Sequence, residues 1–170
     1  MDFFELIERR HSVRAFHATP VQAEALERIL RACDIAPSAG NLQAYEIYVV
    51  EESGRRAALA KAAFDQDFIK QAPVALVFCT HPARAKRYGE RGASLYAVQD
   101  VTIAAAYAQL AAVSLGLASC WVGAFDEAKA AAALELPAGQ RPIVILPIGF
   151  PAETPATNPR RGVADLVHRG

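Results

Sequence analysis

The segment Arg9-Arg10-His11-Ser12-Val13-Arg14 places three guanidinium groups and a hydroxyl within six consecutive residues. Arginine forks bind the oxygens of a phosphate in pairs, so this grouping is typical of a site for a dianionic phosphate. The same residues would also suit the solvated C-terminal end of a helix, where positive charge is favoured. Pro159-Arg160-Arg161, near the end of the chain, is a second basic group with the same two interpretations.

Two further segments combine small residues with polar side chains. Pro37-Ser38-Ala39-Gly40-Asn41-Leu42-Gln43 lies between an expected helix and an expected strand, and its small residues would let the backbone approach a ligand closely. Ser119-Cys120-Trp121-Val122-Gly123-Ala124-Phe125 offers a similar approach at Gly123-Ala124. Taken alone, each segment also fits an ordinary connection between two elements of secondary structure.

The common motifs of nucleotide, hydrolase and metal sites are absent from the sequence. It contains no G-x-G-x-x-G, no G-x-x-x-x-G-K and no G-x-S-x-G. The four histidines lack the spacing of metal ligands, and the three cysteines, Cys33, Cys79 and Cys120, lie far apart. We therefore expect no metal site and no disulfide framework.

The composition indicates one folded domain spanning residues 1–170, because the chain has 170 residues, of which 53% are hydrophobic. Its 18 basic residues are matched by 18 acidic ones, which argues against a protein that binds nucleic acid through bulk charge. The uncharged stretch from Val101 to Ala118 is mostly small, so it predicts a buried helix rather than a membrane span. No apolar leader follows Met1, and we expect a cytoplasmic protein without membrane contact.

Hydrophobic periodicity and capping residues predict five helices and four strands. Asp2 and Glu5 form a capping box for a first short helix, and Thr19-Pro20-Val21-Gln22 forms another for a second helix that ends before Pro37. The remaining helices are expected at Ala57 to Phe64, Ser94 to Leu115 and Asp126 to Leu136, and the strands at Tyr45 to Val50, Val74 to Cys79, Ser119 to Val122 and Ile143 to Ile148.

Two features of this pattern concern assembly. The helix from Ser94 to Leu115 holds many of the 36 alanines, and small residues let helix backbones approach closely. The stretch of about residues 150–170 shows little periodicity and is unusually long for a loop inside a compact domain. It therefore predicts an arm that packs on something else, for which a second copy of the chain is a candidate.

Taken together and in order, these segments resemble the nitroreductase family of flavin enzymes. The resemblance runs along nearly the whole chain, and the sequence is that of a short member without a long insertion that would cover a substrate. It further includes Gln66-Asp67-Phe68 to Ala72-Pro73-Val74, Arg87-Tyr88-Gly89 with the helix through Gly116, and the tail from Pro159 to His168. The resemblance implies an α+β fold with a central, mostly antiparallel sheet flanked by helices and a C-terminal arm exchanged in a homodimer.

The resemblance also implies which residues bind the cofactor, FMN, at the homodimer interface. The phosphate and pyrimidine edge would be held by Arg10, Ser12 and Arg14, with His11 contributing mainly through its backbone and Arg160 and Arg161 completing the clamp. Pro37, Ser38 and Ala39 would approach the isoalloxazine from the partner subunit, with Asn41 nearby. Gly123 and Ala124 would bring backbone N–H groups near the flavin N5, and Gln66 would bond the flavin ring.

The activity implied is transfer of hydride from NADH or NADPH to the flavin, followed by reduction of a nitroaromatic, quinone or similar small-molecule acceptor in a ping-pong mechanism. The chemistry then belongs to the flavin, and no protein side chain is expected to act as catalytic nucleophile or acid. Three alternatives stay open: other flavin chemistry, such as oxidative dehydrogenation or flavin breakdown, a non-enzymatic flavin-binding or regulatory protein, and an interaction module without cofactor.

Overall fold

A computed structural model describes all residues from Met1 to Gly170 and contains one four-stranded sheet with the strand order β1-β2-β4-β3. The strands are β1 (Tyr45–Val50), β2 (Val74–Thr80), β3 (Ala118–Ser119) and β4 (Arg141–Gly149), and every neighbouring pair is antiparallel. The predicted α+β fold with an antiparallel sheet flanked by helices is therefore confirmed.

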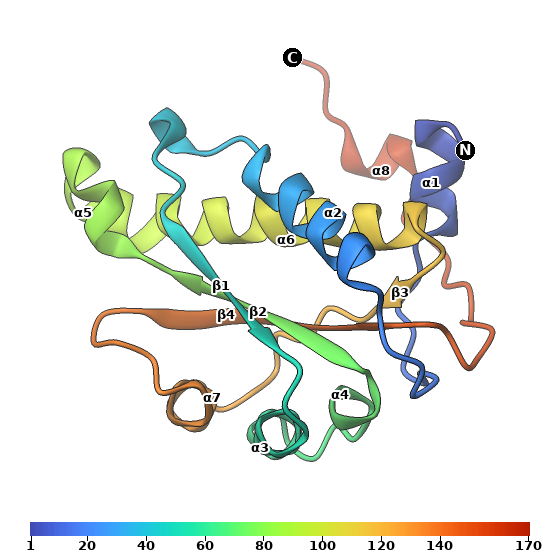
Figure 1. Cartoon of the computed structure of the whole chain (residues 1–170). Helices are drawn as coiled ribbons and strands as arrows, with labels where there is room; N and C mark the ends of the chain where they lie inside the picture. The colour runs from blue at the N-terminus through green and yellow to red at the C-terminus, as the bar shows by residue number, and fades with distance from the viewer.

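Helices cover both faces of the sheet (Figure 1). One layer holds α1 (Phe3–Arg9), α2 (Ala23–Asp34) and the long α6 (Ala97–Ser114), and the other holds α3 (Ser53–Ala62), α4 (Phe68–Gln71) and α7 (Glu127–Leu134). All residues of the central strand β2 are buried, and alternate side chains point into different layers. Leu76 and Phe78 pack with α2 and α6, whereas Val77 and Cys79 pack with α3 and α7.

Shorter elements connect these layers. A turn of 3-10 helix, η1 (Ala39–Asn41), follows α2, and η2 (Pro82–Tyr88), α5 (Gly89–Arg91) and a π-helical turn, η3 (Gly92–Tyr96), lead from β2 into α6. The last helix, α8 (Val163–Leu166), lies within the C-terminal stretch. Figure 1 shows η1 and α5 at the N-terminal end of α6, and α1 and α8 at its other end.

The predicted start of the second helix at Thr19-Pro20-Val21-Gln22 is wrong. The helix begins at Ala23, with Gln22 as its N-cap and no capping hydrogen bond from a side chain. The preceding chain stays extended because it first pairs with the end of the sheet, where the His17 N–H donates to the Phe150 carbonyl at 2.9 Å. A local capping pattern cannot report this tertiary contact.

Other boundaries shift for identifiable reasons. The helix α3 begins at Ser53, before the expected Ala57, because the Glu52 carboxylate accepts from the N–H groups of Gly54 and Arg55 at 2.7 Å each. It ends before Phe64, which has a left-handed φ of 57°. The first turn expected for the long helix is the π-helical η3, and the third strand is only the two residues of β3.

The predicted burial of the alanine-rich helix is confirmed, because Val101, Ala104, Ala105 and Ala108 of α6 have no exposed surface. None of the helices combines the length and apolar character that crossing a membrane requires.

The C-terminal stretch contrasts with α6, since every side chain from Ala156 to Gly170 is exposed and α8 buries none of its residues.

Candidate functional site

A cavity of about 640 Å³ opens where the N-terminal segment meets the C-terminal stretch. We call it the arginine cavity. It brings together four of the residues predicted to bind a phosphate, Arg10, Ser12, Arg14 and Arg160, although the last of these is remote in sequence. Its full lining consists of Ile7, Glu8, Arg10, His11, Ser12, Arg14, Glu153, Pro155, Ala156, Asn158 and Arg160.

The sheet fixes the N-terminal part of this lining. As the chain leaves α1, Ser12 pairs with Ser119 of β3 in a parallel bridge, and the Val13 N–H donates to the Ser119 carbonyl at 3.1 Å. Val13 is buried in the core, and Gln109 of α6 donates to the Ser119 hydroxyl at 3.3 Å. Arg10 and Arg14 are therefore held on either side of an anchored Ser12.

The charges of the cavity suit a dianionic ligand. Arg10, Arg14 and Arg160 form no ion pair with a carboxylate of the chain, so three guanidinium groups in one cavity are free to bind a ligand. Phosphate oxygens are the acceptors that such forks bind in pairs. Two carboxylates, Glu8 and Glu153, also line the cavity and oppose this charge, and Glu153 accepts a hydrogen bond from the Arg14 backbone N–H. These residues fit the phosphate end of a nucleotide cofactor.

The small-residue loop from Pro37 to Gln43 has a strongly curved backbone. Gly40 and Asn41 have left-handed φ values of 58° and 56°, and the Gln43 N–H donates to the Ser38 hydroxyl at 3.0 Å. Pro37, Gly40 and Asn41 are exposed, whereas Ser38 and Ala39 are half-buried. The loop therefore presents an open, compact surface with little side-chain bulk.

A buried carboxylate that the sequence analysis did not identify holds this loop. Asp100, in the first turn of α6, is 2% exposed; one oxygen accepts from the Ala39 N–H at 2.9 Å and the other from the Ala44 N–H at 3.2 Å. No cation pairs with it. A sequence signal existed, because Asp100 is the one charged residue in the long run from Ala97 to Phe125.

Gln66 and Ala124 meet on the other face of the sheet. The Gln66 side-chain amide donates to the Ala124 carbonyl at 3.2 Å and to the Ala63 carbonyl at 2.9 Å. Both amide hydrogens are thus used within the chain, and only the side-chain oxygen is free to meet a ligand. Gly123 and Ala124 themselves are exposed, so their backbone is open to an approaching molecule.

The arginine cavity is lined by no residue of the loop from Pro37 to Gln43, nor by Gln66, Gly123 or Ala124. The loop at Ala39 is attached to the first turn of α6, whereas Ser12 of the arginine cavity pairs with Ser119, which Gln109 in the second half of α6 contacts. Asp100 and Gln109 lie nine residues apart on this helix, which corresponds to about 14 Å along its axis. Arg161 also lies outside the cavity, since its guanidinium pairs with Asp165 at 2.5 Å.

Burial sets the chemistry of the thiols. It raises the pKa of Cys33 and of Cys79 to about 12, which keeps both protonated at neutral pH. Burial also raises the pKa of Cys120, against the opposing effect of the positive charges of Arg14 and Arg10. The cavity therefore holds cations and hydrogen-bond donors but no reactive thiolate, which suits a site that binds a cofactor.

Comparison with known proteins gives a consistent result. Residues 7–66 and 55–150 match the model of the Nitroreductase family. An NAD(P)H-dependent FMN reductase of Bacillus subtilis is 34% identical over 163 residues, which cover 88% of this chain and 66% of that protein.

Two solved structures resemble the fold closely. The NADPH:FMN oxidoreductase of Vibrio harveyi, solved in complex with NAD+, has a TM-score of 0.90 and 28% identity, and the match covers 98% of this chain and 76% of that one. An FMN-dependent nitroreductase of Clostridium difficile has a TM-score of 0.84 and 26% identity, with 98% of both chains covered.

Proposed function

Because this chain belongs to the nitroreductase family and is an FMN-dependent NAD(P)H oxidoreductase, we propose that it reduces quinones, nitroaromatics or similar small acceptors by a ping-pong mechanism. The observation that carries the cofactor assignment is the arginine cavity, where three guanidinium groups that form no ion pair lie around an anchored serine. Arg10, Ser12, Arg14 and Arg160 hold the FMN phosphate there, and His11 contributes mainly through its backbone. Arg161 joins them only when its pair with Asp165 opens.

The rest of the flavin site comes from a second copy of the chain. Pro37, Ser38 and Ala39 of one copy approach the ring of the flavin whose phosphate the other copy holds, and Asn41 lies nearby. This arrangement is supported by the lining of the arginine cavity, which includes no residue of the loop. We propose a homodimer with two equivalent composite sites.

Exposed apolar side chains support the homodimer. Phe3 and Phe4 of α1 are 60% and 71% exposed, and Val163 and Leu166 of α8 are 76% and 57% exposed. Tyr107 adds an aromatic ring on the outer side of α6. Large apolar side chains that are exposed on neighbouring elements are typical of a surface that a partner covers. The C-terminal arm, which packs little on its own chain, would then lie across the second copy.

Bound FMN supplies a ring that accepts hydride from NADH or NADPH and passes two electrons to an acceptor. The chain orients that ring and limits access to it. Exposed Gly123 and Ala124 would offer backbone N–H groups to the N5 side of a bound flavin, and the free side-chain oxygen of Gln66 would accept a hydrogen bond from its ring. In a ping-pong mechanism the donor would leave as NAD(P)+ before the acceptor enters.

An absorbance experiment tests this function. The purified protein should show a flavin spectrum, NADH or NADPH should bleach it under anaerobic conditions, and a quinone or nitroaromatic should restore it. A protein that takes up no FMN would contradict the assignment. Bound FMN that neither donor reduces would instead indicate a non-enzymatic flavin protein.

A further inference from the structure

The segment from Arg84 to Tyr96, which connects β2 to α6, is strongly basic although the chain as a whole is neutral. It carries Arg84, Lys86, Arg87 and Arg91 against a single acid, Glu90. None of these four cations pairs with a carboxylate. We call this stretch the cationic segment.

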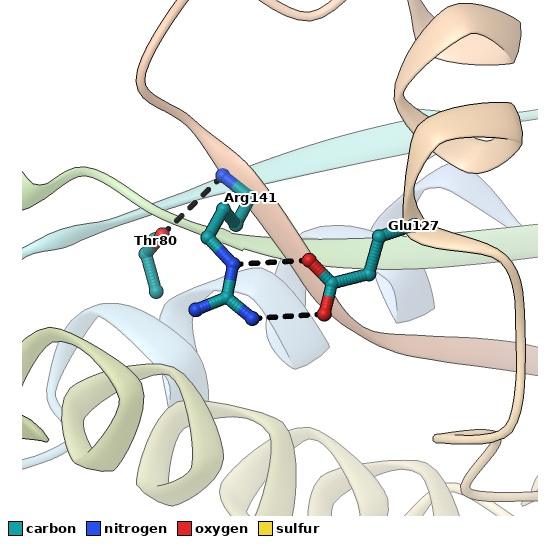
Figure 2. Close-up of polar contacts among 3 residues, drawn as sticks. All are labelled: Thr80, Glu127 and Arg141. Atoms are coloured by element: carbon teal, nitrogen blue, oxygen red, sulfur yellow. Dashed lines mark hydrogen bonds and ion pairs between the residues drawn. The ribbon is translucent and has the colours of Figure 1, made fainter. Parts of the chain in front are cut away.

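Paired arginines elsewhere in the chain show the contrast. Arg141 of β4 makes a two-bond contact with Glu127, with nitrogen–oxygen distances of 3.0 and 2.8 Å, and its charge is thereby compensated (Figure 2). Side chains of the cationic segment have no such partner, so their charge stays available to a ligand.

Aromatic rings hold two of these cations in place. The Arg87 guanidinium lies 5.0 Å from the centre of the Tyr88 ring, and that of Arg91 lies 5.6 Å from the Tyr96 ring. The two tyrosines pack edge to face at 5.3 Å, and Arg91 also donates to the Tyr96 hydroxyl at 3.2 Å. A guanidinium that stacks on an aromatic face keeps its charge and most of its N–H donors. Both arginines are therefore positioned without being neutralised.

The cationic segment lies against the loop that meets the flavin. The hydroxyl of Tyr88 packs so closely on Gly40 that a Cβ there would collide with it. Arg84 donates to the Leu42 carbonyl at 3.2 Å, and the neighbouring His81 N–H donates to the Ala44 carbonyl at 2.8 Å. A molecule that reaches the flavin across this loop therefore passes beside Arg87 and Arg91.

NADPH and NADH differ only in the 2′-phosphate of the adenosine half. That group adds about −1.5 to −2 charges at neutral pH and three acceptor oxygens, as a phosphate monoester does elsewhere in proteins. Two guanidinium groups without counter-ions are complementary to it, whereas the 2′-hydroxyl of NADH offers them no charge. We propose that Arg87 and Arg91 bind the 2′-phosphate of NADPH and so make NADPH the preferred donor. This inference rests on the proposed function, because it assigns the donor of that same site.

Nucleotide fragments test the inference without any redox reaction. The FMN-loaded full chain should bind adenosine 2′,5′-bisphosphate at least about tenfold more tightly than 5′-AMP, measured by isothermal titration calorimetry. The Arg87→Ala/Arg91→Ala double variant should lose this difference. The matched control is Arg55→Ala/Lys61→Ala, which removes the same charge from the exposed side of α3 and should keep the difference.

Equal binding of the two nucleotides by the unmodified protein would overturn the proposal, as would an undiminished preference in the Arg87→Ala/Arg91→Ala variant. Kinetics give a second readout, since the ratio of kcat/KM for NADPH to that for NADH should fall at least about tenfold in this variant. Failure of the proposed function looks different, because it appears as missing FMN or missing bleaching with both donors. Bleaching by NADH without any nucleotide preference would overturn only the inference about NADPH.

Discussion

The Asp100 carboxylate accepts a hydrogen bond from the Ala39 backbone N–H at 2.9 Å and thereby joins the central helix α6 to the loop proposed to meet the flavin. Its second oxygen accepts from the Ala44 N–H, so the same side chain holds both ends of the curved backbone. Ala44 is fully buried, and no water can replace this acceptor without disturbing the core. One buried side chain therefore holds both ends of the loop, and Arg84 and Tyr88 contact its middle.

Replacing Asp100 should change both stability and cofactor binding. Asp100→Ala leaves two backbone N–H groups without an acceptor, each at a cost of about 1–3 kcal/mol, so the free energy of unfolding should fall by about 2–6 kcal/mol. FMN affinity should fall as well, because the loop loses its anchor. Denaturant unfolding followed by circular dichroism and quenching of FMN fluorescence measure the two effects.

Asp100→Asn gives the graded comparison, since it keeps the side-chain shape but turns one acceptor into a donor. Its losses should lie between those of the unmodified protein and of Asp100→Ala. Glu24→Ala, an exposed acid on α2 without a hydrogen-bond partner, is the control for lost charge. FMN affinity that stays normal in folded Asp100→Ala would show that the anchor does not position the loop for the flavin.

Removing the guanidinium of Arg10 should weaken FMN binding. A hydrogen bond between charged groups contributes about 2 kcal/mol, so Arg10→Ala should raise the Kd for FMN about thirtyfold. Riboflavin, which lacks the phosphate, should bind the variant and the unmodified protein equally. Lys61→Ala removes an unpaired cation far from the cavity and should not change either affinity. An equal loss for riboflavin and FMN would place Arg10 away from the phosphate.

The charge of Glu153 should oppose the FMN phosphate. Glu153→Gln keeps an acceptor for the Arg14 N–H but removes a negative charge from the arginine cavity, so the Kd for FMN should decrease several-fold at low ionic strength. High salt should reduce the gain because it screens exposed charges. Weaker FMN binding by this variant would mean that the carboxylate contributes to the site instead of opposing it.

The pair of Glu127 and Arg141, shown in Figure 2, should contribute to stability in a pH-dependent way. The hydrogen bonds from Arg141 lower the pKa of Glu127, so the folded chain favours the ionised carboxylate. The stabilisation is therefore complete above the ordinary pKa of glutamate and is lost as the pH falls through the lowered value. Both side chains are about half exposed, which limits the effect to less than about 1 kcal/mol.

Unfolding of Glu127→Gln in denaturant, measured from neutral to acidic pH, tests this pair. The variant should be slightly less stable at pH 7, and the difference should vanish once the pH lies below the lowered pKa of Glu127. Glu24→Gln serves as the control for an acid without a partner. A difference that persists at acidic pH would have to come from packing and not from the ion pair.

Much of the fold is predictable from the sequence because its strongest signals are local. The strands β1 and β2 are short runs rich in β-branched, aromatic and other apolar residues. Such runs favour a β-strand over other secondary structure. The capping boxes show why local signals also fail. The one at Asp2 is formed, whereas Thr19 stays outside its helix because His17 is bound to the edge of the sheet.

The candidate site is less predictable because distant residues build it. Arg10 and Arg160 lie at opposite ends of the sequence, and only the resemblance to a family suggested that they meet. Asp100 reaches Ala39 across 61 residues, and no motif marks that contact. Arg161 adjoins Arg160 yet pairs with Asp165, because consecutive residues in an extended segment point in different directions.

Mixing two inactive variants tests the composite site most directly. Arg10→Ala damages the arginine cavity, Asp100→Ala damages the loop, and each alone should bind FMN poorly. In a mixed homodimer, the intact cavity of one copy meets the intact loop of the other. Refolding the two variants together in equal amounts should therefore restore about a quarter of the normal FMN content, because half of the dimers are mixed and each has one intact site. FMN content that stays at the level of the separate variants would contradict a site shared between two copies.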